Sequence, residues 1–113
     1  MVFLQVAIGG ALGAMLRYGI GLFLVFPFGT LAVNVLGSFL MGLAFVLLSN
    51  RGAAPFVMAG VLGGFTTFSA FSLDVFKLYE AERIAAAGGY VAASVILSIG
   101  ALALGVAMAR SFS

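Results

Sequence analysis

The chain has 113 residues, of which 65% are hydrophobic and 7% are charged, and its mean hydropathy is +1.33. Soluble domains carry about 25% charged residues, so this composition excludes a soluble protein and indicates an integral membrane protein. The net charge of +2 is too small and dispersed for a nucleic-acid-binding surface, and the lack of cysteine and histidine excludes disulfides, thiol chemistry and imidazole-based sites.

A membrane helix needs about 20 apolar residues, so the chain can hold four of them with short loops. The sequence predicts spans at Phe3–Leu24, Thr30–Leu48, Phe56–Tyr79 and Gly88–Ala109. Together they predict an all-α fold with one membrane domain over residues 1–113. We expect no cleavable signal peptide, because the first apolar run lacks a basic leader and continues as a full span.

The first two spans each carry one polar feature of interest. Small residues flank an arginine at four-residue spacing on one face of the first span: Gly9, Gly13, Arg17 and Gly21. Such a face lets another helix approach closely. Arg17 is either an interfacial anchor or a fixed positive charge at the mouth of an anion path. In the second span, Asn34 either bonds a neighbouring helix or offers its N–H to a permeating anion.

The third span is unusual in its middle, which reads GVLGGFTTFSAFSLD from Gly60 to Asp74. Three glycines lower its helix propensity, and the hydroxyl side chains that follow compete for backbone hydrogen bonds. Inside a membrane, an unwound backbone is tolerated only where protein buries it or where it lines a wet cavity. The pattern therefore predicts a helix that is broken at the membrane midplane and forms a binding site there.

Phe68 and Phe71 are three residues apart, so they share a face of the helix after this break. Such a pair is either core packing or a site. Aromatic rings have positive edges, so two rings and a few N–H or O–H donors can meet a small anion without presenting a full charge. This compromise suits conduction, which requires binding that is favourable but weak.

The fourth span aligns Tyr90, Ser94 and Ser98 at positions i, i+4 and i+8, either as a wet track or as contacts between helices. No acidic residue lies in the first, second or fourth span, although a proton-coupled cation exporter needs an intramembrane carboxylate. The chain also offers no nucleophile–base pair and no ligand set for a catalytic metal, so we expect a protein that is not an enzyme.

The loop charges do not fix one orientation. With four spans, Arg51 and Arg110 share a side, and Lys77 and Arg83 lie opposite, with Arg17 if it reaches that interface. The near balance is compatible with a weakly biased single orientation and with a chain that inserts both ways and pairs antiparallel with itself.

Four motifs carry a resemblance that covers the chain from end to end. They are GALGAMLRY at 10–18, GTLAVNVLGSF at 29–39, GGFTTFSAFS at 63–72 and the stripe of Tyr90, Ser94 and Ser98. In these motifs the chain resembles the small bacterial fluoride channels of the Fluc or CrcB family. The resemblance implies an antiparallel, dual-topology homodimer in a bacterial or archaeal plasma membrane, with two fluoride pores and a structural sodium ion at the dimer interface.

The same resemblance assigns residues. It implies that the ring edges of Phe68 and Phe71 line the fluoride path, that Asn34 donates to the ion, and that the backbone carbonyls of Gly63 and Thr66 bind sodium. The further polar residues expected along the path are Thr67, Ser69, Tyr90, Ser94 and Ser98, with Arg17 in the vestibule. Ala70 stands where many members have threonine, so the expected hydroxyl contact is missing there.

Three functions compete. The first is a passive fluoride channel that lets the cell lose fluoride. The second is a small proton-coupled multidrug exporter, against which the missing carboxylate in the first span argues. The third is a structural subunit that transports nothing, but packing alone does not require the hydroxyl-rich break.

Overall fold

The computed structural model describes residues 1–112, and this part of the chain is helical apart from its turns and a short extended stretch within the third span. The elements are α1 (Val2–Gly21), α2 (Phe28–Leu48), the π-helix η1 (Pro55–Leu62), α3 (Gly63–Phe65), α4 (Phe68–Glu80) and α5 (Ile84–Phe112). The described residues contain four helical segments long and apolar enough to cross a membrane, the third being the composite segment Pro55–Glu80. The prediction of four spans is confirmed.

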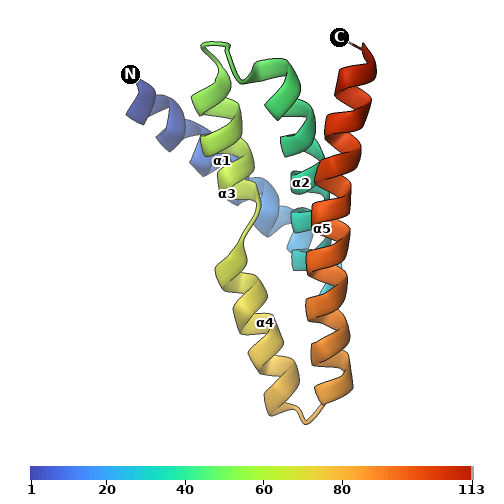
Figure 1. The fold of residues 1–113 in the computed structure, drawn as a ribbon. Coiled ribbons are helices and arrows are strands. Elements are labelled where there is room, and N and C mark those ends of the chain that lie inside the picture. Colours follow the sequence, from blue (N-terminus) through green and yellow to red (C-terminus); the bar gives the residue numbers. More distant parts are fainter. Residues whose placement is uncertain (113) are drawn as a thin grey trace.

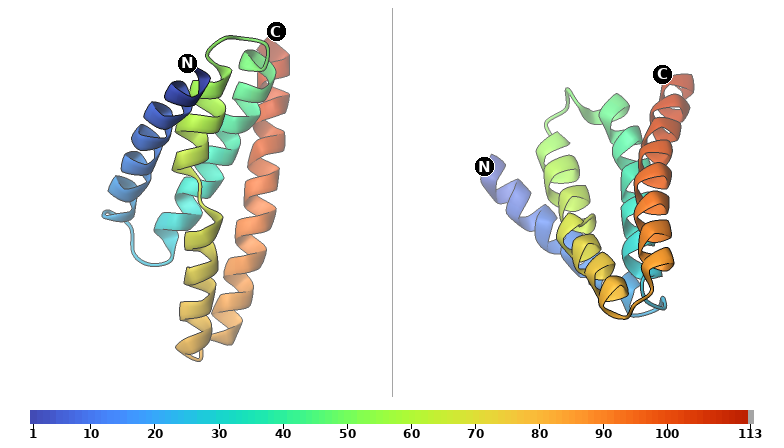
Figure 2. Two further views of the ribbon diagram at one scale, coloured as in Figure 1. Left: turned by 90° about the vertical axis from the view of Figure 1, so that its left-hand side faces the viewer. Right: turned by 60° about the horizontal axis from the view of Figure 1, so that its bottom comes forward.

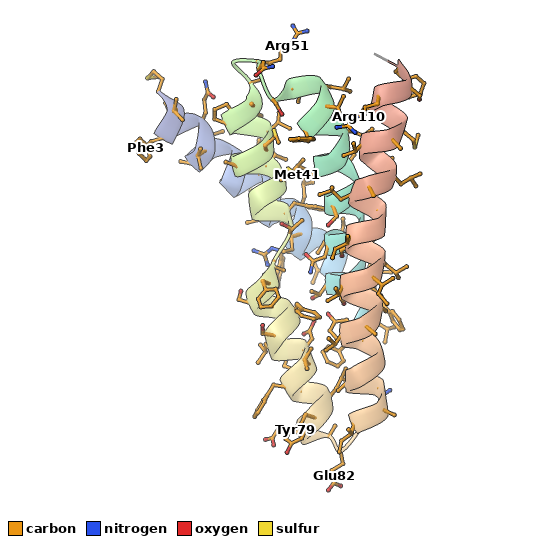
Figure 3. The ribbon with its side chains drawn as sticks, in the orientation of Figure 1. Phe3, Met41, Arg51, Tyr79, Glu82 and Arg110 are labelled. Carbon is orange, nitrogen blue, oxygen red and sulfur yellow. The ribbon has the colours of Figure 1, made fainter. Side chains whose placement is uncertain are left out.

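The spans alternate in direction (Figure 1). Both ends of the described chain lie at one end of the bundle with the α2–η1 loop, while the α1–α2 loop and the α4–α5 hairpin lie at the other (Figure 2). Arg51 marks the first end, and Tyr79 and Glu82 mark the tip of the hairpin (Figure 3). α2 packs mainly on α5, α1 packs on η1 and α3, and α4 packs on α5.

Three predicted boundaries differ from those of the structure. α1 ends at Gly21 rather than Leu24, because the amides of Leu22 and Phe23 bond three residues back, to the carbonyls of Gly19 and Ile20, which tightens and ends the last turn. The fourth span begins at Ile84 rather than Gly88 and ends at Phe112 rather than Ala109. Strong helix formers, Ala85 to Ala87, extend it at the start.

The third span begins as a π-helix, which the sequence pattern did not predict. η1 runs from Pro55 to Leu62, with Pro55 in the first turn, where its missing N–H costs no helical hydrogen bond. π-helical turns are rare and are often found at functional sites. Here the π-helix leads directly into α3 and the break that follows.

Glycines let α1 approach this first part of the third span at backbone distance, as the spacing in the first span predicts. A Cβ placed on Gly60 would lie 2.9 Å from the Cα of Gly9, and one placed on Gly64 would lie 2.6 Å from the carbonyl oxygen of Gly10. Real Cβ contacts essentially never reach such distances. The two helices can therefore cross here only because these positions have no side chain.

Candidate functional site

The helical course of the third span stops for two residues between α3 and α4. Thr66 has φ −86° and ψ 157°, and Thr67 has φ −154° and ψ 125°, so both are extended. Thr66 still closes the preceding helix, because its amide and hydroxyl both donate to the carbonyl of Leu62. Thr67 opens the next one, since its Oγ1 accepts from the amide of Ala70 at 3.1 Å. The interruption is thus capped on both sides.

Side chains of two other helices hold this interruption. Asn34 of α2 bonds Thr67 twice: its Nδ2 donates to the Thr67 carbonyl at 3.0 Å, and its Oδ1 accepts from the Thr67 amide at 2.8 Å. Arg17 of α1 donates from Nε to the carbonyl of Gly64 at 3.2 Å. Both side chains therefore satisfy backbone groups that an unbroken helix would satisfy itself.

Three aromatic rings follow one another just below the interruption. The ring centroids of Phe68 and Phe71 are 5.3 Å apart with planes tilted by 53°, and those of Phe71 and Tyr90 are 5.4 Å apart with a tilt of 42°. Phe68 is 77% exposed within the single chain, whereas Phe71 is 8% exposed. Tilted pairs turn the positive edge of one ring toward the face of the next, so the row offers edges as well as faces to its surroundings.

The hydroxyl of Tyr90 donates to Oδ2 of Asp74 at 3.0 Å. Both residues are buried, and the Asp74 side chain is 8% exposed. A buried carboxyl group is costly without a partner, so this hydrogen bond accounts for much of its tolerance. The pair joins α4 to α5 one turn below Phe71.

A groove of about 340 Å³ lies between the interruption, α2 and α5, and every residue that lines it in the described chain is uncharged. It brings together six of the residues predicted for the fluoride path: Asn34, Thr67, Phe68, Phe71, Ser94 and Ser98. The Ser94 hydroxyl is buried and has no hydrogen-bond partner within the described residues. An unpaired buried hydroxyl in a groove is available to a ligand.

A second hollow, of about 400 Å³, lies on the other side of the interruption and carries two positive side chains, Arg17 and Lys77. Thr30 and Ala70 also line it, and Thr67 lines both this hollow and the groove. The Lys77 ammonium lies 5.6 Å from the ring centroid of Phe26 in the α1–α2 loop. Thr67 is therefore the residue that separates a positively charged hollow from a neutral groove.

Besides Arg17, which lines the second hollow, three predicted site residues do not line the groove. Gly63 and Ser69 are exposed, and Tyr90 does not line the groove but packs on Phe71, which does. The Ser69 hydroxyl lies 3.3 Å from that of Thr67. A Cβ on Gly63 would meet only the carbonyl oxygen of Met58, at an ordinary 3.5 Å. Packing within the chain therefore does not require glycine at position 63.

Sequence reasoning missed Asp74 and Lys77 as neighbours of the site. Asp74 lies one turn after Phe71 and so shares its side of α4, whereas Lys77 lies two turns after Ala70 and shares the side that lines the second hollow. The two hydrogen bonds between Asn34 and Thr67 were also missed, because they join residues 33 positions apart.

Comparisons with known proteins give one consistent result. Residues 4–106 match the family described as CrcB-like protein, Camphor Resistance (CrcB). The chain is 51% identical to the "Fluoride-specific ion channel FluC" of Paracoccus denitrificans (strain Pd 1222), over 96% of this chain and 94% of the relative. Proteins with the same name from Cereibacter sphaeroides (strain ATCC 17029 / ATH 2.4.9) and Agrobacterium fabrum are 52% and 44% identical, over 96% and 94% of this chain and 94% of each relative.

Proposed function

Because this chain belongs to the CrcB family, we propose that it is a fluoride-specific ion channel through which fluoride leaves the cell passively, which lowers its cytoplasmic level and toxicity. The chain is a multi-pass protein of the plasma membrane, with four spans. The observation that carries the proposal is the uncharged groove at the interrupted helix, which combines phenylalanine rings with hydroxyl and amide groups.

The fluoride path follows this groove. Ring edges of Phe68 and Phe71 attract the anion, and the hydroxyls of Ser94 and Ser98 with the Asn34 amide replace part of its hydration shell. Thr67 and Ser69 lie at the interruption, and Tyr90 supports Phe71 from behind. No lining group carries a charge in the described chain, so binding stays weak enough for the ion to leave.

The hollow that contains Arg17 and Lys77 is the vestibule of this path. Positive charge at a water-filled mouth raises the local anion concentration. The Arg17 side chain is held in place, because its Nε donates a hydrogen bond to the Gly64 carbonyl. Its role is therefore to attract fluoride toward Thr67 and the groove.

The working unit is an antiparallel homodimer with its interrupted helices at the membrane midplane. Support comes from the near balance of positive loop residues and from Gly63, which is exposed although nothing in its own chain needs a glycine there. A carboxy-terminal reporter that works on one side of the membrane should be only partly active. A reporter active in every copy would overturn the dual orientation.

A sodium ion at the dimer interface completes the proposal. The carbonyls of Gly63 and Thr66 lie at the helix interruption, and unwound carbonyls are the donors with which membrane proteins coordinate sodium. Two copies related by a twofold axis would supply four such oxygens. The chemistry of the donor set therefore fits a monovalent hard cation that holds the dimer together.

Anion efflux from liposomes that contain only this protein tests the function. We expect fluoride efflux that is electrogenic and needs no imposed pH gradient, and far slower chloride efflux from the same vesicles. Efflux that requires a proton gradient would favour the exporter. A correctly assembled protein without any fluoride efflux would contradict the channel.

A further inference from the structure

The interruption of the third span diverts two particular amide groups from the carbonyls they would meet in a continuous helix. An α-helix bonds each amide to the carbonyl four residues earlier. The amide of Thr67 would then bond the carbonyl of Gly63, and the amide of Ala70 would bond that of Thr66. In the structure the Thr67 amide donates to Oδ1 of Asn34 at 2.8 Å, and the Ala70 amide donates to Oγ1 of Thr67 at 3.1 Å.

Each diversion leaves one carbonyl without its usual helical donor, and these are the carbonyls of Gly63 and Thr66. Of the two carbonyls between them, that of Gly64 is engaged, because it accepts a hydrogen bond from Nε of Arg17 at 3.2 Å. A carbonyl that already accepts from a guanidinium is a poor ligand for a cation. The side chains around the interruption thus leave the carbonyls of Gly63 and Thr66 for a ligand and engage that of Gly64.

We propose that Asn34 and Thr67 are positioning residues of the cation site: their side-chain oxygens occupy two amides and thereby hold the carbonyls of Gly63 and Thr66 off the helical ladder. This inference rests on the sodium site proposed above and assigns Asn34 a second task. One amide side chain then serves the anion path and the cation site, so a change at Asn34 alters both.

Sodium dependence of dimer stability tests this idea without measuring transport. The melting temperature of the purified dimer is followed in detergent as sodium replaces N-methyl-D-glucamine at constant ionic strength. The matched variants are Thr67→Val, which keeps the shape but removes the accepting oxygen, and Thr67→Ser, which keeps the oxygen. Ser72→Ala is the control, since the exposed Ser72 hydroxyl bonds back only to the Phe68 carbonyl.

We expect the sodium concentration of half-maximal stabilisation to rise about tenfold or more in Thr67→Val, since that factor corresponds to roughly one net hydrogen bond. Thr67→Ser and Ser72→Ala should stay near the wild-type value. If Thr67→Val gives no dimer at any sodium concentration, Asn34→Leu repeats the test at the other diverted amide, with Ser49→Ala, at the exposed carboxy-terminal end of the same helix, as its control. Asn34→Leu should then show the same tenfold rise.

The outcomes separate this inference from the proposals beneath it. A wild-type dimer stabilised by sodium, with an unchanged half-maximal concentration in Thr67→Val or in its substitute Asn34→Leu, would overturn the positioning role and leave the cation site standing. A wild-type dimer that does not respond to sodium would overturn the cation site and this inference together. Fluoride efflux from the same preparation reports on the channel independently of both.

Discussion

The part of the third span before the interruption touches its neighbour backbone to backbone, whereas the part after it touches its neighbour through side chains. Gly60 and Gly64 bring η1 and α3 directly onto α1. α4 instead meets α5 through a cluster of Phe71, Leu78, Ala87 and Tyr90. Backbone atoms in contact cannot move apart by changing rotamer, whereas side chains can. The first part is therefore suited to hold carbonyls in fixed positions, and the second to line a path for an ion.

The largest expected effect comes from adding a side chain where α1 packs on the backbone of η1 and α3. A Cβ on Gly13 would lie 2.8 Å from the amide nitrogen of Phe65 and would collide with the Val61 carbonyl. Since no neighbouring side chain can move away, Gly13→Val should abolish the folded protein and with it the proposed dimer, measured as dimer yield in gel filtration.

Gly10→Val is the matched control for Gly13→Val. It changes the same residue type on the same helix, but a Cβ there meets nothing within 4 Å. We expect a dimer yield near that of the wild type. Normal yield from Gly13→Val would mean that α1 does not approach the third span at backbone distance.

Substitutions in α4, the part after the interruption, should lower the protein yield less but lower fluoride transport strongly. Phe68→Ile and Phe71→Ile keep most of the bulk, so each should cost at most about 1.5 kcal/mol of stability. They remove the ring edges, so fluoride efflux should fall by orders of magnitude while dimer yield stays near normal. Efflux and yield are measured on the same preparations.

Phe76→Ile provides the comparison on the same helix. Its ring is 57% exposed and lies against Tyr79 rather than in the groove. Its efflux should match the wild type. Wild-type efflux from both groove variants would show instead that Phe68 and Phe71 are packing residues.

The smallest expected effect concerns the hydrogen bond between Tyr90 of α5 and Asp74 of α4. Tyr90→Phe keeps the ring that packs on Phe71 but removes the hydroxyl that donates to Asp74. The buried carboxyl group then loses that partner, and the dimer should lose about 1–3 kcal/mol of stability, seen as a lower melting temperature. Tyr79→Phe, at a ring that is 58% exposed, should melt like the wild type. An equal melting temperature for both variants would remove the structural role of the Tyr90–Asp74 pair.

The span count followed from the sequence because long apolar runs set it. Phe68 and Phe71 could be placed on one face, since helical spacing determines that. The π-helix η1 could not be predicted, because hydropathy does not report how many residues make a turn. Contacts between separate helices were equally hidden: the spacing of Asn34 and Thr67 gives no sign that the Asn34 side chain bonds the Thr67 backbone. Sequence patterns therefore predicted the region of the candidate site, and the structure supplied the hydrogen bonds there.

α5 is longer than a membrane requires, and this bears on how the chain adapts to its host bilayer. With 29 residues and a rise of about 1.5 Å each, it is about 43 Å long, whereas the hydrocarbon core is about 30 Å thick. A usual tilt of about 20° absorbs only a small part of this excess. The left view of Figure 2 places the extra length at the α4–α5 hairpin, which extends past the α1–α2 loop and carries the exposed charges of Glu80, Glu82 and Arg83. The excess length of α5 therefore lies at the charged hairpin tip, about four helical turns from Thr67, where a thicker or thinner bilayer can bury or expose more of it without reaching the interruption.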